Sequence, residues 1–248
     1  MKFIFEVFSR TFVFAVFLIG ISFIHHKCSA NEKIRVLVVD TGVDLSHKEI
    51  RSHVKENTNS NNYRDLNGHG TSMAGLVLKN TCEEVELISC NYRDYSIFNF
   101  IDTTTNCFRR ALNENIQYIN YSSTGSLPSN DEREVLQKLS DKGVIITVAA
   151  GNNGKNLINK KTGKCDGSYP SCYLIKNVYI IQNINEYGYL HSTSNFISHV
   201  NARSEIGVNV PVLAPDNGTG IMTGTSPATA KHLNRLLLQR CEELKKKP

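Results

Sequence analysis

The sequence lacks the patterns that mark several large classes of protein. It has no Cys-x-x-Cys pair and no histidine at ligand spacing from its cysteines, so no zinc site is predicted. Basic and aromatic residues do not alternate, and the net charge is only +5, which argues against a nucleic-acid surface. No internal repeat, low-complexity tract or linker divides the chain. With 248 residues, 40% of them hydrophobic and 21% charged, the composition fits one globular domain that can bury a core.

The sequence also lacks an apolar run of the roughly 20 residues that a membrane span needs. The apolar run Phe12–Ile24 is shorter, follows the basic residues Lys2 and Arg10, and precedes the small residues Ser29 and Ala30. We therefore predict that residues 1–30 are a signal peptide, with an uncleaved membrane anchor as the alternative. Residues 31–248 would then form the exported domain, in a secreted or extracytoplasmic location.

An even number of cysteines remains beyond residue 30, which is typical of disulfide-bonded proteins in oxidising compartments. These are Cys82, Cys90, Cys107, Cys165, Cys172 and Cys241. Spacing favours one pair, Cys165 with Cys172, because these two flank a short loop that contains Gly167 and Pro170. The sequence leaves the pairing of the others open.

Apolar segments alternate with amphipathic ones along the exported domain. Strands are predicted at Ile34–Val39, Val85–Ser89, Ile116–Ser122, Val144–Ala150, Val178–Gln182 and Val208–Leu213. Helices are predicted at 72–78, 102–115, 129–142 and from Ser226 toward Cys241. Residues 44–67 are polar and rich in asparagine, and predict a long surface loop. The alternation predicts an α/β fold with a mostly parallel central sheet and helices on both faces.

A serine stands at the predicted start of the last helix, in the stretch Met222–Ala230. Gly224 permits a tight turn, and Pro227 suits a first helical turn because its missing N–H would have no intrahelical partner there. Ser226 would then lie beside free backbone N–H groups, which favour a developing negative charge. A serine at such a place is more often only a helix cap, so other residues must supply the chemistry.

Three further polar residues follow strands or open helices, at the sheet edge where ligands gather. Asp40 follows the first strand, His69 lies between two glycines at a helix start, and Asn152 follows the fourth strand. Each of them alone also fits a turn or a cap. Together with Ser226 they supply the carboxylate, base, nucleophile and oxyanion donor that amide hydrolysis needs.

The motifs around these residues resemble those of the subtilisin-like serine peptidases. The motifs are Val38-Val39-Asp40-Thr41-Gly42-Val43-Asp44, Gly68-His69-Gly70-Thr71-Ser72-Met73-Ala74-Gly75, Ala149-Ala150-Gly151-Asn152-Asn153-Gly154 and Gly224-Thr225-Ser226. They occur in the family's order of Asp, His and Ser, and the resemblance spans about Ile34–Leu238. It implies the subtilisin-like three-layer α/β fold and the activity of a serine endopeptidase.

The resemblance also implies a role for each site residue. Ser226 would attack the scissile carbonyl, His69 would take and return the proton, and Asp40 would orient His69. The Asn152 amide and the Ser226 N–H would bind the oxyanion. This chemistry needs no cofactor; structural calcium occurs in the family, but no ligands can be assigned here.

The segment Ile119-Asn120-Tyr121-Ser122 resembles the family's strand beside the substrate. We therefore expect Ser122, Ser123, Thr124 and Gly125 to line a roomy primary pocket for a polypeptide substrate. The protein is expected to be a monomer that contacts no nucleic acid, and to meet a membrane only if its N-terminal segment stays uncleaved.

The sequence differs from the family pattern in three respects. Pro227 and Ala230 alter the flank of the serine, although the N–H of Ser226 itself remains. Asp216 replaces the glycine of an Ala-Pro-Gly segment. Only Asn31–Val39 separate the expected cleavage point from Asp40, so we expect no folding propeptide, and a domain that folds unaided or with other help. The alternative function is that of a catalytically inactive relative that binds peptides.

Overall fold

The computed structural model describes residues 33–58, 65–92 and 100–246; the predicted signal peptide lies outside them. In chain order the elements are β1 (Ile34–Asp40), β2 (Val54–Thr58), α1 (His69–Leu78), β3 (Val85–Asn91), α2 (Phe100–Asn113), β4 (Tyr118–Tyr121), α3 (Asn130–Asp141), β5 (Ile145–Ala149), η2 (Ser171–Tyr173), β6 (Val178–Ile184), β7 (Ala202–Ile206), β8 (Val210–Ala214), β9 (Gly218–Met222) and α4 (Thr225–Lys245). Within these described ranges, no helix has the length and apolar character needed to cross a membrane.

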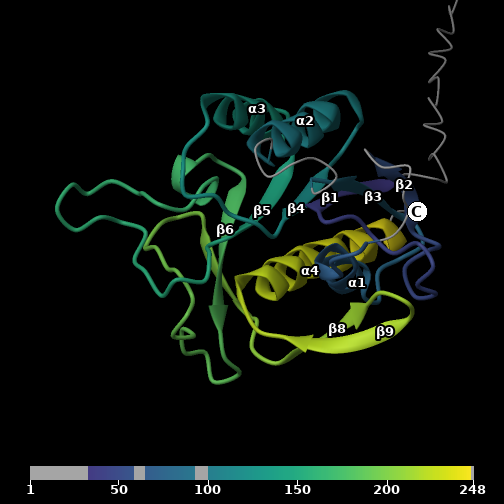
Figure 1. Ribbon diagram of the computed structural model, residues 1–248. Coiled ribbons are helices and arrows are strands. Elements are labelled where there is room, and N and C mark those ends of the chain that lie inside the picture. Colours follow the sequence, from purple (N-terminus) through teal and green to yellow (C-terminus); the bar gives the residue numbers. More distant parts are fainter. Residues whose placement is uncertain (1–32, 59–64, 93–99, 247–248) are drawn as a thin grey trace, which may run out of the picture. The chain divides into compact units, whose positions relative to one another are not determined.

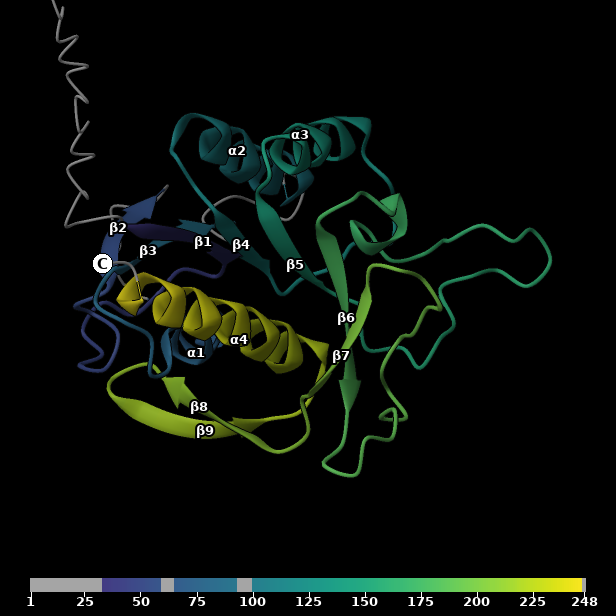
Figure 2. The same ribbon diagram turned by 180° about the vertical axis from the view of Figure 1, so that it is seen from behind.

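Seven parallel strands form the central sheet, in the order β2-β3-β1-β4-β5-β6-β7. Helices α2 and α3 cover one face of the sheet, and α1 and α4 cover the other (Figures 1 and 2). The strand order changes direction at β1, because β3 and β4 lie on opposite sides of it. Ligand sites of open α/β sheets form at such a point, beyond the carboxyl ends of the strands. The predicted three-layer α/β fold is confirmed.

The sequence of β1 explains why it lies in the middle of the sheet. Apart from Arg35, the residues that precede Asp40 are apolar on both faces, as expected for a parallel strand that is covered by helices on both sides. Leu37 and Val39 belong to the core under α2 and α3. Val36 and Val38 belong to the core under α1 and α4. The end of this strand, Asp40, is therefore held by two cores at once.

Several strands differ from the sequence-based expectation. β2 lies inside the segment predicted as a long loop, so that prediction is wrong for 54–58, and residues 59–64 lie outside the described part. β7 was not predicted either; it reads Ala-Arg-Ser-Glu-Ile, which has no apolar run. Both strands lie at the edges of the sheet, where a strand has a single neighbour. β8 pairs with β9 in an antiparallel hairpin, so the predicted strand 208–213 is not part of the parallel sheet.

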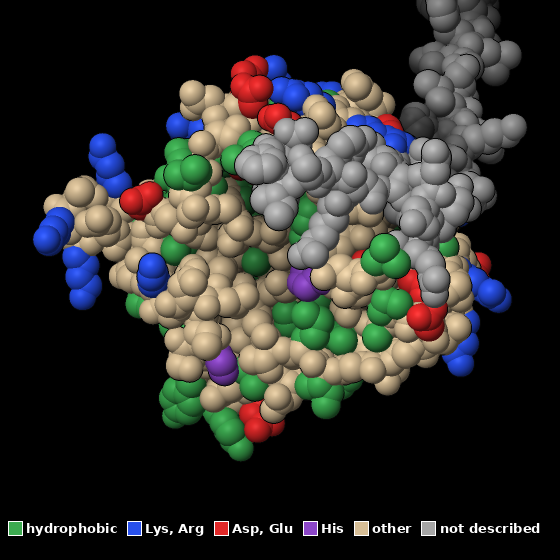
Figure 3. Space-filling model, viewed as in Figure 1, with side chains coloured by type: hydrophobic (Ala, Val, Ile, Leu, Met, Phe, Trp, Pro, Cys, Tyr) green, Lys and Arg blue, Asp and Glu red, His purple; other side chains and the backbone are tan. Residues whose placement is uncertain are grey.

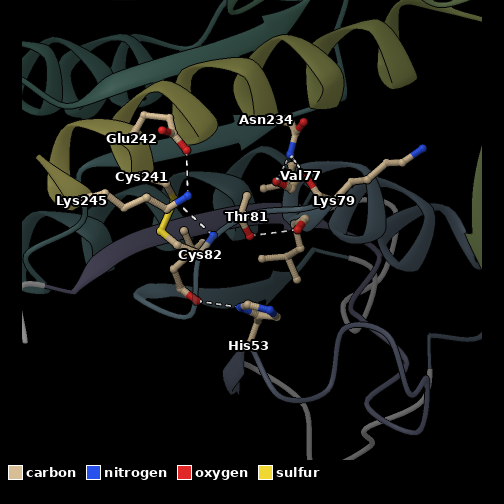
Figure 4. The surroundings of a disulfide bond; sticks show 11 residues. His53, Val77, Lys79, Thr81, Cys82, Asn234, Cys241, Glu242 and Lys245 are labelled. Atoms are coloured by element: carbon tan, nitrogen blue, oxygen red, sulfur yellow. Dashed lines mark hydrogen bonds and ion pairs between the residues drawn. A yellow bond between two sulfur atoms is a disulfide. The ribbon is translucent and has the colours of Figure 1, made fainter.

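Disulfides join Cys82 to Cys241, Cys90 to Cys107 and Cys165 to Cys172, and the last is the pair that spacing favoured. The first of them links the segment after α1 to the end of α4 (Figure 4).

Nearby, Asn234 on α4 donates hydrogen bonds from Nδ2 to the carbonyl oxygens of Val77 and Lys79, at 2.9 and 2.8 Å. These contacts satisfy carbonyl groups at the end of α1, which have no partner within the helix. The Cys82–Cys241 disulfide and the Asn234 hydrogen bonds therefore connect α1, which begins at His69, with α4, which begins at Thr225. These are the two helices that carry the predicted base and nucleophile.

The turn between β8 and β9 contains Asp216, which replaces a family glycine. Its φ of +58° lies in the left-handed region that glycine adopts without steric cost and that aspartate tolerates better than most residues. The Asp216 N–H donates to Asp44 Oδ2 at 2.7 Å. Pro215, in the same turn, packs against Gly68, which directly precedes α1. Asp216 is thus accommodated in a turn that supports the start of α1.

Asp44 is expected to make the stability of the domain depend on pH in the acidic range. Burial opposes its ionised form, but hydrogen bonds from Ser46 and from the Asp216 N–H outweigh burial and lower the pKa of Asp44. Such a carboxyl stabilises the fold above its unfolded pKa of about 4, and that contribution is lost as pH falls through the lower folded pKa. Urea unfolding between about pH 5 and pH 2 should show a steeper loss for the wild type than for Asp44→Asn. Equal slopes would contradict this assignment.

Candidate active site

Asp40 and His69 form the centre of the candidate site. Asp40 ends β1 and is fully buried, and His69 is the first residue of α1. His69 Nδ1 lies 2.7 Å from Asp40 Oδ1, which also accepts a hydrogen bond from the Thr41 N–H at 2.8 Å. A carboxylate at Nδ1 fixes the orientation and tautomer of an imidazole, and places Nε2 on the side away from Asp40. The pair therefore has the geometry of an oriented general base.

A second buried carboxylate, Asp65, organises the loop that leads into α1. Its Oδ1 accepts hydrogen bonds from the hydroxyl of Thr41 at 2.8 Å and from the N–H groups of Asn67 and Gly68 at 3.2 and 2.9 Å. Its Oδ2 accepts from both the N–H and the hydroxyl of Thr71, each at 2.8 Å. Asp65 therefore joins the end of β1 to the first turn of α1, and so fixes the position of His69 relative to Asp40.

Asp65 is one residue of the site that the sequence interpretation missed, because it lies within the predicted polar loop. The sequence signal that marks Asp65 is its place three residues before Gly68, because an aspartate side chain accepts hydrogen bonds from backbone N–H groups that follow it closely.

The glycines of the histidine motif are explained by close packing. A Cβ at Gly70 would lie 2.0 Å from the carbonyl oxygen of Gly42, so no larger residue fits between β1 and α1.

Ser226 lies in the first turn of α4. Its hydroxyl donates to the carbonyl oxygen of Ser122 at 3.1 Å, and the Ser122 hydroxyl donates to the Ser226 carbonyl oxygen at 3.2 Å. The helix continues to Lys245, with Pro227 and Ala230 both buried in it. Pro227 stands where an N–H has no intrahelical partner, so the altered flank fits a regular helix start.

Asn152 lies beside the start of α4. Its Oδ1 accepts hydrogen bonds from the Thr225 N–H at 2.9 Å and from the Thr225 hydroxyl at 3.0 Å. The hydroxyl oxygen of Thr225 accepts in turn from the Gly151 N–H at 3.2 Å. Because Oδ1 accepts these hydrogen bonds, Nδ2 is the end of the amide that can donate a hydrogen bond to a ligand. Thr225, which the sequence interpretation did not single out, orients the predicted oxyanion donor.

Thr225→Val should lower kcat by roughly tenfold, less than the roughly 100-fold or greater loss expected for Asn152→Ala. Valine keeps the shape and the backbone N–H of Thr225 but removes the hydroxyl that holds the Asn152 amide. Steady-state kinetics on one short peptide amide would measure both variants. An unchanged kcat for Thr225→Val would show that the backbone N–H alone is sufficient to orient Asn152.

The predicted substrate strip, Ser122 to Gly125, follows β4. Ser122 is occupied by its contacts with Ser226, and Gly125 pairs with Tyr169 through two hydrogen bonds of 2.8 Å. Between them lie Ser123 and Thr124, which are half-buried. Their backbone groups have no hydrogen-bond partner within the part of the chain that the structure describes. The strip therefore offers a short unpaired edge next to Ser122, the residue that contacts Ser226.

The structure thus brings the four predicted chemical groups to one edge of the sheet. Asp40 ends β1 and Asn152 follows β5, which are the two strands on either side of β4. His69 opens α1, and Ser226 lies in the first turn of α4 against the end of β4. Over the described ranges, no three His, Cys, Asp or Glu residues are arranged to hold a metal ion. A parallel α/β sheet with an aspartate, a histidine and a helix-opening serine in this chain order is the arrangement of a subtilisin-type serine peptidase.

Comparison with known proteins agrees with that class. The model of the subtilase family matches residues 31–232, and the chain belongs to this family of serine peptidases. Subtilisin amylosacchariticus of Bacillus subtilis subsp. amylosacchariticus is 27% identical over 225 residues, which cover 83% of this chain and 55% of that protein. Subtilisin-like protease 3 of Plasmodium falciparum is 27% identical over 185 residues, or 70% of this chain and 22% of that protein. The chain spans about half the length of the first relatives that it matches, 55% for two proteins of Bacillus subtilis and for subtilisin J of Geobacillus stearothermophilus.

Solved structures show the same fold. The self-cleaved protease domain of PatA superposes with a TM-score of 0.72 at 18% identity, covering 87% of this chain and 83% of that one. A cold-adapted subtilisin-like serine proteinase gives a TM-score of 0.69 at 20% identity, covering 86% of this chain and 77% of that one.

Proposed function

We propose that this protein is a secreted serine endopeptidase that uses Asp40, His69 and Ser226 as its triad and Asn152 as an oxyanion donor. The observation that carries the proposal is the 2.7 Å contact between His69 and the buried Asp40, at the sheet edge where the first turn of α4 holds Ser226. A buried carboxylate at Nδ1 serves to orient a base and to stabilise its cationic form.

The proposed reaction proceeds in two halves. His69 Nε2 takes the proton of the Ser226 hydroxyl as its oxygen attacks the scissile carbonyl carbon, and the resulting oxyanion is bound by the Asn152 amide and the Ser226 N–H. His69 then gives the proton to the leaving amine, and an acyl group remains on Ser226. Water, activated by the same histidine, releases this acyl group as the carboxyl product.

The unpaired backbone of Ser123 and Thr124 supports the choice of a polypeptide substrate. An extended peptide can add to such an edge as a further strand, and main-chain hydrogen bonds would then hold it beside Ser226. The small side chains from Ser122 to Gly125 leave space for the side chain of the residue that is cleaved.

Secretion is supported by the disulfides, which persist in oxidising compartments. A membrane-tethered form that keeps residues 1–30 is the alternative, and its chemistry would be the same.

The alternative function, a peptide-binding relative without activity, is disfavoured by the site itself. All four chemical groups are present, and neither Pro227 nor Ala230 interrupts the helix that carries Ser226.

Cleavage of an unfolded protein such as reduced casein tests the proposal. The exported protein should fragment casein, and Ser226→Ala should not. Ser204→Ala, which alters an exposed serine on β7, serves as the matched control and should retain activity. A folded preparation that leaves casein intact would support the inactive peptide-binding relative instead.

A further inference from the structure

A lysine-rich hairpin projects from the domain directly after the candidate oxyanion residue. We call residues 155–166 the lysine hairpin. It carries four exposed lysines, which are Lys155, Lys160, Lys161 and Lys164. Figure 3 shows basic side chains gathered on the segment that projects at the left, which is the green loop at the left of Figure 1.

The positive charge of the lysine hairpin is not neutralised within the described residues. None of the four lysines forms an ion pair with an aspartate or glutamate there. The hairpin contains a single acidic residue, Asp166, at its end. Lysines without partners are compact, hydrated point charges that remain available to an anionic ligand.

The backbone that carries these lysines is held in a defined shape. The Asn159 N–H donates to the Lys164 carbonyl at 2.8 Å, and the Asp166 N–H donates to the Leu157 carbonyl at 3.0 Å. The tip is closed by Asn159 Oδ1, which accepts from the N–H of Lys161 at 2.9 Å. Leu157 is buried in the core, and the Cys165–Cys172 disulfide fixes the other end. Less entropy is therefore lost when such a hairpin binds than when a flexible tail does.

Both ends of the hairpin are attached to the candidate active site. It begins three residues after Asn152. It returns to Ser168, whose hydroxyl donates to the Ala150 carbonyl at 2.8 Å, and to Tyr169, which pairs with Gly125 of the substrate strip. A polypeptide lying along that strip would therefore pass the base of the hairpin.

The composition of the hairpin selects among anionic partners. It has no aromatic residue on which nucleic-acid bases could stack. Its exposed residues are all polar, so it offers no apolar anchor for a membrane. A polypeptide is already the ligand of the adjoining strip, and carboxylates complement unpaired lysines.

From these observations we propose that the lysine hairpin is a docking site for acidic segments of polypeptide substrates, outside the residues that flank the scissile bond. The inference rests on the proposed peptidase function. It means that substrates with clustered Asp and Glu residues are captured faster and cleaved preferentially, because complementary charge raises the association rate.

Matched peptides test this docking site. Each peptide has the same neutral cleavage sequence, extended on one side by a block of either four glutamates or four glutamines, and both sides are tried. For one side at least, we expect kcat/KM at low salt to be about tenfold higher for the glutamate peptide. The preference should vanish in about 0.5 M salt, which shortens the range of charge interactions to a few ångströms.

A charge-reversed hairpin, Lys160→Glu/Lys161→Glu/Lys164→Glu, should abolish the preference and leave the glutamine peptide unaffected. The control Lys79→Glu/Lys176→Glu/Lys246→Glu makes the same change in net charge at exposed positions elsewhere and should keep the preference. Cleavage of the glutamine peptides without a preference for glutamate on either side would overturn the docking site alone. No cleavage of any peptide would instead overturn the peptidase function.

The Ser226→Ala protein allows binding itself to be compared by fluorescence anisotropy. The labelled glutamate peptide should bind more tightly than a single-stranded oligonucleotide of equal charge. Tighter binding of the oligonucleotide, lost in the charge-reversed hairpin, would assign the surface to nucleic acid and contradict the proposal.

Discussion

Asp40→Asn is expected to lower kcat by ~10⁴-fold while the domain stays folded. Asp40 is fully buried, and its Oδ1 is shared by His69 Nδ1 and the Thr41 N–H. Asparagine keeps the size of the side chain but removes the negative charge that stabilises the imidazolium in the transition state. It can also turn its Nδ2 toward His69, which would place the imidazole proton on the wrong nitrogen.

Steady-state kinetics on a short neutral peptide would measure this loss, with circular dichroism to verify that the variant is folded. Asp131→Asn is a suitable control, because Asp131 is 73% exposed and its ion pair with Arg109 is on the surface. That variant should behave as wild type. A folded Asp40→Asn protein with more than about a tenth of the wild-type kcat would show that Asp40 does not act on His69 as proposed.

Asp65→Ala is expected to cause the largest loss of stability, about 4 kcal/mol, at the upper end of the range for single substitutions. Five donors point at the Asp65 carboxylate, and alanine would leave the four that belong to the buried residues Thr41, Gly68 and Thr71 without this acceptor. The same change would release the first turn of α1 from the end of β1, so kcat should also fall because His69 is no longer held at Asp40.

Asp65→Asn gives a finer test of the same network. Asparagine can still accept from Thr41, Asn67 and Gly68 through Oδ1, but its Nδ2 would face the two donors of Thr71. We expect an intermediate loss of stability. Urea unfolding should be measured in the Ser226→Ala background to prevent self-digestion, with the exposed Asp166→Ala as control. A loss below about 1 kcal/mol for Asp65→Ala would mean that other groups support the loop.

The parts of the fold that local sequence dictates could be predicted. β1 has an apolar run, interrupted only by Arg35, because both of its faces are buried. α3 begins at the Ser129 cap because that side chain accepts from the Glu132 N–H. Cys165 and Cys172 pair because they are close along the chain. The edge strands β2 and β7 could not be predicted, because their sequences carry no buried run and their pairing depends on neighbours distant in sequence.

The same limit applies to the candidate site. The motifs mark Asp40, His69, Asn152 and Ser226 because each lies in an unusual local sequence. Asp65 and Thr225 act through partners that only the fold brings near, such as Thr41 for Asp65 and Asn152 for Thr225. The pairing of Cys82 with Cys241 spans 159 residues, and no local pattern indicates it.

Labelling with a fluorophosphonate probe tests the central proposal most directly, because the probe forms a stable bond only with a serine whose hydroxyl is activated by a working base. The account predicts one labelled peptide, carrying the phosphonate on Ser226 in tandem mass spectra, and loss of that label in both Ser226→Ala and His69→Ala. Absence of label on a folded wild-type protein, or label on a different serine, would contradict it.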